Sequence, residues 1–210
     1  MKNEYDSIAL QEGRVLPLME DFYTIQGEGF YSGHAAYFIR LGGCDVGCHW
    51  CDVKESWEAG NHPNTPVEDI VSKIDPKTEL VVITGGEPLM YNLVNLTAQI
   101  KAKGFQTNIE TSGAYEMSGD FDWVCLSPKK TKLPTESAYK AANELKVIIY
   151  NKHDFIFAEE QAAKVNPNAL LLLQTEWSKN KEMMPEIIEY VKEHPKWKIS
   201  LQTHKYLDIP

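Results

Sequence analysis

The chain has 210 residues, with 21 Lys or Arg against 30 Asp or Glu, so its formal net charge is −9 at pH 7. This length predicts one domain, spanning residues 1–210, that buries roughly 70% of its unfolded surface without disulfides. A hydrophobic content of 43% excludes a disordered chain, and the acidic balance argues against a nucleic-acid-binding protein.

The apolar runs are too short for a membrane protein. Those at residues 80–83 and 169–173 fall far below the roughly 20 residues that a spanning helix needs. The first residues contain no apolar stretch of the signal-peptide type. We therefore expect a cytoplasmic protein without membrane contact, whose four cysteines stay reduced.

Short apolar runs rich in Val and Ile alternate with helical segments along the chain. The expected strands are residues 36–41, 80–84, 105–110, 123–126, 145–150 and 170–174, with 198–201 as a candidate for a seventh. The expected helices are residues 66–74, 89–103, 154–165 and 182–194. A capping box from Thr65 to Glu68 opens the first, Gly104 ends the second, and Pro185 fits only the first turn of the last. The alternation predicts an α/β fold whose parallel sheet is open or curled into a barrel.

Glycine and polar residues follow five of the predicted strands. They are residues 42–44, 85–88, 110–113 and 127–129, together with Gln174. Because the carboxyl ends of parallel strands meet at one edge of a sheet, and this edge carries the active site in such folds, we expect a functional site there.

Cys44, Cys48 and Cys51 form a Cys-x3-Cys-x2-Cys cluster, and Cys125 stands apart. A disulfide is a poor explanation in a reducing compartment with an odd number of cysteines in the loop. A structural zinc ion would need a fourth Cys or His ligand, and the ring of His49 is expected to point away from its neighbours' site. Three thiolates on an iron–sulfur cluster would leave one iron open to an exogenous ligand.

The cysteine triplet, with Trp50 before its last member, resembles the cluster-binding motif of the radical S-adenosylmethionine (SAM) superfamily. Residues 85–88 (Gly-Gly-Glu-Pro) resemble the second motif of that superfamily. The resemblance implies a [4Fe–4S] cluster on the three cysteines, with the amino and carboxylate groups of SAM on the open iron. It also implies reductive cleavage of SAM to a 5′-deoxyadenosyl radical, which takes a hydrogen atom from the substrate.

From about residue 20 to the C-terminus the chain resembles the 7-carboxy-7-deazaguanine synthase family. The matching segments are residues 26–29, 38–41, 50–52, 84–88, 110–113, 127–129 and 201–207. This resemblance implies a carbon–nitrogen lyase that converts 6-carboxy-5,6,7,8-tetrahydropterin to 7-carboxy-7-deazaguanine and ammonia, on the route to queuosine and other 7-deazapurines of modified tRNA. It further implies a homodimer with a shortened, partly open (β/α) barrel, SAM returned intact, and a flavodoxin- or ferredoxin-type electron donor.

The same resemblance assigns site residues. The substrate contacts are Ile25, Gln26, Gly27, Glu28, Arg40, Thr84 and the terminal carboxylate of Pro210. The SAM contacts are Trp50, Cys51, Asp52, Gly86, Glu87, Thr111, Ser112, Ser127, Pro128, Lys129 and Gln174. Judged from the residues alone, Arg40 would form a salt bridge, Glu87 would cap a helix and Lys129 would be a solvated charge.

One position departs from the family pattern. Family members usually have Thr or Ser two residues after the third cysteine, and its hydroxyl helps to hold Mg²⁺ beside the substrate carboxylate. Here that position is Val53, which has no oxygen for a cation that prefers oxygen ligands. We expect a weakened dependence on Mg²⁺, with Asp52 as a candidate substitute.

Two other functions remain open from the sequence. A glycyl-radical activating enzyme shares the cysteine spacing but has no need of residues 26–29 or of the tail at 202–207. A non-catalytic zinc-binding module would explain the cysteines alone, and it would be colourless where an iron–sulfur protein is brown.

Overall fold

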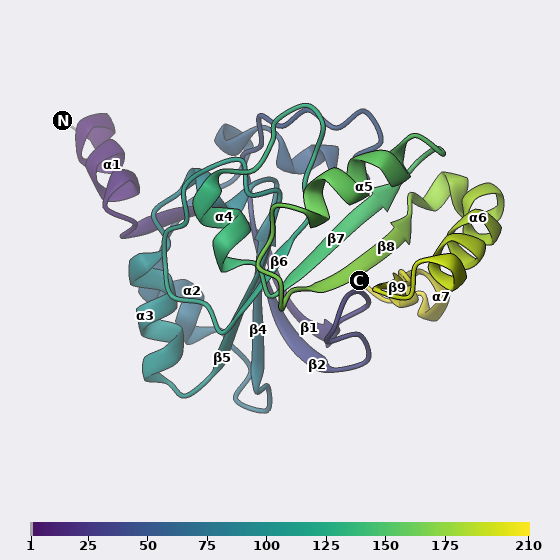
Figure 1. Cartoon of the computed structure of the whole chain (residues 1–210). Coiled ribbons are helices and arrows are strands. Elements are labelled where there is room, and N and C mark those ends of the chain that lie inside the picture. The colour runs from purple at the N-terminus through teal and green to yellow at the C-terminus, as the bar shows by residue number, and fades with distance from the viewer. Residues whose placement is uncertain (1) are drawn as a thin grey trace.

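The computed structural model describes residues 2–210 and contains a single open sheet of nine strands in the order β3-β1-β2-β4-β5-β6-β7-β8-β9 (Figure 1). The strands are β1 (Val15–Ile25), β2 (Ala35–Leu41), β3 (Asn64–Pro66), β4 (Leu80–Gly85), β5 (Gln106–Thr111), β6 (Trp123–Leu126), β7 (Glu144–Ile149), β8 (Leu170–Thr175) and β9 (Trp197–Ser200). From β2 to β9 all neighbours are parallel, whereas β1 is antiparallel to both β2 and β3. All seven predicted strands are confirmed within one or two residues, and so is the α/β fold with a partly open barrel.

Seven α-helices accompany the sheet within the described residues. They are α1 (Lys2–Gln11), α2 (Val67–Ser72), α3 (Val94–Ala102), α4 (Glu136–Ala141), α5 (Asp154–Ala162), α6 (Asn180–Glu193) and α7 (Thr203–Leu207). Short 3-10 turns lie at Lys54–Ser56, Ala59–Asn61, Pro88–Met90 and Trp177–Lys179. No helix of this part of the chain combines the length and the apolar character that crossing a membrane requires.

Three details of the predicted helices are wrong. The capping box at Thr65 does not form, because Thr65 belongs to β3 and its hydroxyl donates to the Pro63 carbonyl, so α2 begins only at Val67. The helix expected at 89–103 is split into a 3-10 turn and α3, which starts at Val94. Finally, α6 begins at Asn180, which leaves Pro185 inside its second turn instead of its first.

The alternation of side chains along the strands separates a helix-facing layer from the inside of the barrel. In β7, Leu145, Val147 and Ile149 pack into a core with residues of α4, α5 and α6, while Glu144 and Lys146 face the other way. A second core joins β2, β4 and β5 to α2 and α3. The inward residues of β5 are polar as well: Gln106, Asn108 and Glu110. The sheet therefore has an apolar outer face, which helices cover (Figure 1), and an inner face that carries polar groups.

Candidate active site

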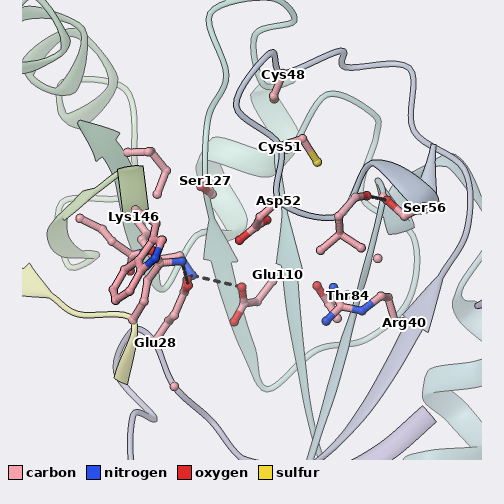
Figure 2. A pocket seen from close by; sticks show the side chains of 18 of the residues that line it. Glu28, Arg40, Cys48, Cys51, Asp52, Ser56, Thr84, Glu110, Ser127 and Lys146 are labelled. Atoms are coloured by element: carbon pink, nitrogen blue, oxygen red, sulfur yellow. Dashed lines mark hydrogen bonds and ion pairs between the residues drawn. The ribbon is translucent and has the colours of Figure 1, made fainter. Parts of the chain in front are cut away.

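A cavity of about 330 Å³ lies on the inner face of the sheet. Its walls come from the ends of strands β1, β2, β4, β5, β7 and β8, from the loop that follows β2, and from the C-terminal tail. Figure 2 shows the cysteine loop above the cavity, Glu28, Glu110 and Lys146 on one side, and Arg40 with Thr84 on the other. Nearly all predicted site residues line this cavity, Ile25 and Pro210 included, and the exceptions are Glu87 and Pro128.

The three clustered cysteines line the cavity together and are all partly buried. Backbone hydrogen bonds close their loop at its base, from the Gly43 amide to the Ser56 carbonyl and from the Cys44 amide to the Trp57 carbonyl. Burial raises the pKa of Cys44, as do the nearby Glu87 and Cys51. Burial and the two other thiols likewise raise the pKa of Cys48, against the opposing charge of Lys129. Binding a metal would therefore release protons from these thiols.

Three thiols that share one cavity suit a cluster better than a single ion. Among the side chains that the structure describes, no three His, Cys, Asp or Glu residues meet as they would around one metal ion. In a cubane cluster each thiolate binds a different iron, so the sulfurs need not converge on a point. The three thiols in one cavity fit an iron–sulfur cluster.

The glycine turn after β4 is packed directly against the cysteine loop. The Gly86 amide donates to the Leu41 carbonyl at 2.9 Å, and the Glu87 amide donates to the Gly43 carbonyl at 2.8 Å. A Cβ on Gly86 would overlap the Gly43 carbonyl oxygen and lie 2.7 Å from the Cβ of Cys44. Glycine is thus required here because two backbones meet.

Glu87 differs from the prediction that it contacts SAM. Its side chain is 1% exposed and lies outside the cavity wall. Its carboxylate accepts from the Leu89 amide at 3.0 Å, from the Thr111 hydroxyl at 2.5 Å, and from both the amide and the hydroxyl of Ser112. Glu87 therefore caps the 3-10 turn and ties β4 to β5, which is the alternative that the residues alone suggested.

The loop after β6 lies beside the cysteines. Ser127 lines the cavity, and Pro128 is buried outside its wall. Lys129 donates to both oxygens of Ser127, at 2.6 and 2.7 Å, and its ammonium lies 5.5 Å from the centre of the Trp50 ring. Lys129 is therefore a wall residue and not the solvated charge of the alternative interpretation.

Arg40 forms a salt bridge and also lines the cavity. Its Nε donates to Glu20 Oε1 at 2.6 Å, so the salt bridge exists, and its guanidinium lies 6.0 Å from the centre of the Phe22 ring. The same side chain lines the cavity, where Figure 2 shows it extending toward Thr84, its register partner on β4. The ion pair fixes the guanidinium at the cavity wall without removing it from the cavity.

The opposite wall carries a cluster that the sequence analysis did not identify. Lys146 Nζ lies 2.5 Å from Glu28 Oε2 and 3.1 Å from Glu110 Oε2. Gln26 donates to Glu110 at 2.7 Å, and Gln202 donates to Glu28 at 2.9 Å. Burial alone would raise the pKa of Glu28, but the charge of Lys146 and hydrogen bonds from Lys146, Gln202 and Gln174 lower it to about 2.

The C-terminal tail closes one side of the cavity. The Thr203 amide and hydroxyl both donate to the Gly27 carbonyl, at 2.8 and 2.9 Å, and Lys205 pairs with Asp52 at 3.1 Å. His204 packs on Gly27 so closely that a Cβ there would lie 2.7 Å from the Cβ of His204. These contacts bring Pro210 to the cavity wall.

The residues around Val53 do not fit a magnesium ion. Val53 lines the cavity and offers no side-chain oxygen, and the nearby Ser56 hydroxyl is buried and donates to the Val53 carbonyl at 2.7 Å. The Asp52 carboxylate already pairs with Lys205. A cation that requires oxygen ligands therefore finds no prepared side-chain site at this position.

The polar wall residues that the sequence analysis did not assign to the site include Glu110, Lys146, Gln202 and His204. Lys146 had a usable signal, since it is a charged residue within an apolar strand, as Arg40 is. Gln202 and His204 gave no comparable signal, because only the folded tail brings them beside residues 27 and 28.

Comparisons with known proteins agree with this site. Residues 38–119, which include the cysteine loop and the glycine turn, match the Radical SAM superfamily. A 7-carboxy-7-deazaguanine synthase of Flavobacterium psychrophilum is 64% identical over 203 residues, covering 97% of each chain. The Synechocystis protein of the same name is 49% identical, over 92% of this chain and 93% of its own.

The fold is also found among solved structures. The crystal structure of QueE from Escherichia coli superimposes with a TM-score of 0.80 at 31% identity, covering 94% of this chain and 98% of that one. Such coverage leaves no large part of either chain unmatched.

Proposed function

The chain belongs to the 7-carboxy-7-deazaguanine synthase family of radical SAM proteins, and we propose that it converts 6-carboxy-5,6,7,8-tetrahydropterin to 7-carboxy-7-deazaguanine and ammonia. The chemical class that follows is a carbon–nitrogen lyase, since ring contraction expels one nitrogen. The activity would serve the route to queuosine and other 7-deazapurines of tRNA.

The two ends of the cavity carry groups of opposite charge, and this difference supports the proposed substrate. One end carries the Glu28 and Glu110 carboxylates, which accept hydrogen bonds, and the other carries the Arg40 guanidinium (Figure 2). Gln202 Oε1 is buried without a hydrogen-bond partner among the described residues, so it too awaits a donor. A pterin presents amino and ring N–H groups on one edge and a carboxylate at the far end, which matches this arrangement.

The cysteine loop would hold the [4Fe–4S] cluster that the family uses. Cys44, Cys48 and Cys51 are its protein ligands in this proposal, and SAM would bind between the glycine turn at Gly86 and the loop at Ser127. When bound, cluster and SAM supply the radical that starts the reaction. The chain itself binds and orients the pterin, and its tail keeps water from the reacting carbon.

The deciding experiment is an anaerobic turnover assay of the iron-reconstituted protein with SAM, reductant and 6-carboxytetrahydropterin, read by mass spectrometry. Formation of the deazaguanine acid with SAM unconsumed supports the proposal. A brown protein that cleaves SAM but forms no product would return the substrate question to the glycyl-radical activase alternative. A colourless protein with bound zinc would refute radical chemistry.

Several narrower proposals follow from the resemblance. We expect a flavodoxin- or ferredoxin-type reductant, a homodimer, and a cytoplasmic location, where the reducing environment keeps the three cysteines available to iron. Light scattering after size exclusion tests the dimer, and reduction of the cluster by each purified donor tests the reductant. We also propose turnover without a strict need for Mg²⁺, because Val53 removes an oxygen ligand.

A further inference from the structure

Lys146 is a buried cation within the binding wall. It lies on β7, between outward residues that belong to the apolar core, and its side chain is 3% exposed. The side chains of its two partners are more open, at 16% for Glu28 and 24% for Glu110. A ligand in the cavity would therefore meet the two carboxylates first, with the lysine behind them.

The two carboxylates are held in the same way. Each places one oxygen on Lys146 and the other on a glutamine amide, Gln202 for Glu28 and Gln26 for Glu110. Two donors on two different oxygens fix the plane of a carboxylate. About two of the four lone-pair sites remain for a ligand on Glu110, and about one remains on Glu28, which Gln174 also contacts. Figure 2 shows the lysine between the two glutamates.

The buried carboxylates around Lys146 need a compensating positive charge to stay ionised. The titratable groups that face the cluster are Glu28 from the loop after β1, Glu110 from β5, Cys125 from β6, Lys129 from the following loop, Glu144 from β7 and His204 from the tail. Three of these are carboxylates in a poorly solvated space. Without Lys146, burial and mutual repulsion would favour protonation of Glu28 or Glu110, and a protonated carboxyl loses acceptor sites.

We propose that Lys146 is a positioning residue that keeps Glu28 and Glu110 ionised and oriented as paired hydrogen-bond acceptors for the amino and ring N–H edge of the substrate, without touching the substrate itself. This inference rests on the proposed function for the identity of that edge. Lys146 belongs to none of the sequence motifs. This role also explains why a charged side chain occupies the middle of an apolar strand.

The test uses Lys146→Met, which keeps the length of the side chain and removes its charge, with Lys198→Met on the exposed part of β9 as a matched control. Without the charge of Lys146, burial raises the pKa of Glu28, so a large part of this carboxyl is protonated at pH 7, and we expect KM for the pterin to rise about tenfold. The ratio of the KM of the variant to that of the wild type should fall as the pH rises from 6.5 to 8.5. Comparing ratios cancels any titration of the substrate.

A second readout needs no substrate. In the wild type the folded-state pKa of Glu28 is depressed, so this group stabilises the fold above its unfolded pKa, and that stability is lost only as the pH falls toward about 2. In Lys146→Met the pKa is raised instead, so the variant should lose thermal stability as the pH rises from 5 to 8. The double variant Lys146→Met/Glu28→Gln removes the unpaired carboxylate and should recover part of that loss.

The outcomes separate the role of Lys146 from the proposed function. A loss of melting temperature that is equal at every pH, with KM unchanged, would make Lys146 a packing residue only. A KM increase that is equal at every pH would indicate a direct contact and overturn the positioning role. If Lys146→Met does not fold and the double variant does not fold either, the charge-pairing argument is wrong. If the wild type makes no product from the pterin, the proposed function fails while the stability readout still decides on Lys146.

Discussion

Arg40 has a structural contact and a position in the cavity wall at the same time. Its Nε is paired with Glu20 at 2.6 Å while the side chain lines the cavity. We expect Arg40→Ala to remove about 2 kcal/mol of pterin binding, a roughly 30-fold rise in KM, because a partly buried charge partner is lost. Cluster content and SAM cleavage without substrate should not change.

The control for Arg40 is its ion-pair partner. Glu20→Gln leaves the guanidinium in the cavity, and a neutral amide at this partly exposed position should raise KM by less than about fivefold. Equal effects of Arg40→Ala and Glu20→Gln on stability, with KM unchanged in both, would show that Arg40 is purely structural.

Val53 tests the metal requirement at a single position. The wild type should lose little turnover when Mg²⁺ is removed with EDTA, because Val53 offers no side-chain oxygen and the nearby Ser56 hydroxyl donates to the Val53 carbonyl. Val53→Thr restores a hydroxyl, and we expect its turnover to respond to added Mg²⁺ over the millimolar range. A sharp, saturable loss of wild-type activity on removal of Mg²⁺ would contradict this expectation.

At the residue scale, short motifs made most of the site predictable. Gln26, Glu28, the cysteines and Gly86 occur in continuous patterns, so their types and spacing were informative, and they all line the cavity. The position of Glu87 in a motif does not show that its oxygens accept from Leu89, Thr111 and Ser112. The orientation of a side chain depends on its folded neighbours, which spacing alone does not give.

At the scale of elements, the glycine turn after β4 sets the distance between two loops. Because a Cβ on Gly86 would overlap the Gly43 carbonyl and crowd Cys44, Gly86→Ala must push the cysteine loop away. We expect a cost of about 1–3 kcal/mol in folding free energy and a lower iron content after reconstitution. Iron and sulfide analysis with a thermal melt measures both.

Gly60→Ala is the matched control for this turn, since a Cβ there would meet nothing within 4 Å. It should reconstitute as the wild type does. If Gly86→Ala also reconstitutes fully and melts at the wild-type temperature, the two loops do not depend on this close contact.

The elements themselves were unequally predictable. Strands β2, β4, β6, β7 and β8 were visible because each contains an apolar run, as expected for strands that are covered on their helix side, whereas β5 and β9 mix apolar and polar residues. Strand β1 was missed because Glu20 and Asp21 interrupt it, its burial is irregular, and its partners β2 and β3 are antiparallel to it. The five-residue helix α7 was missed because contacts with Gly27 and Asp52 stabilise it, and these are distant in sequence.

At the scale of the whole molecule, the fold and the cluster site are separable. The two large cores draw on strands β1, β2 and β4 to β9 and on helices α2 to α6, and neither includes a residue of the cysteine loop at 44–57. The stability of the chain therefore comes from the sheet and its helices. The loop depends on them through a few backbone hydrogen bonds at its base.

This separation predicts the behaviour of the protein without its metal. Cys48→Ala should lose the brown colour and all turnover, yet it should keep the far-UV circular dichroism of the wild type and unfold cooperatively. Because Cys48 lies outside both cores, we expect the free energy of unfolding to fall by about 1 kcal/mol or less relative to the wild-type apoprotein. In a chain of this size, this change lowers Tm by no more than about 4 °C.

Cys125→Ala, at a buried position on β6 away from the triplet, should instead retain colour and turnover. A broad, non-cooperative transition in Cys48→Ala would mean that the cluster organises the barrel, and a colourless Cys125→Ala would place that cysteine among the ligands.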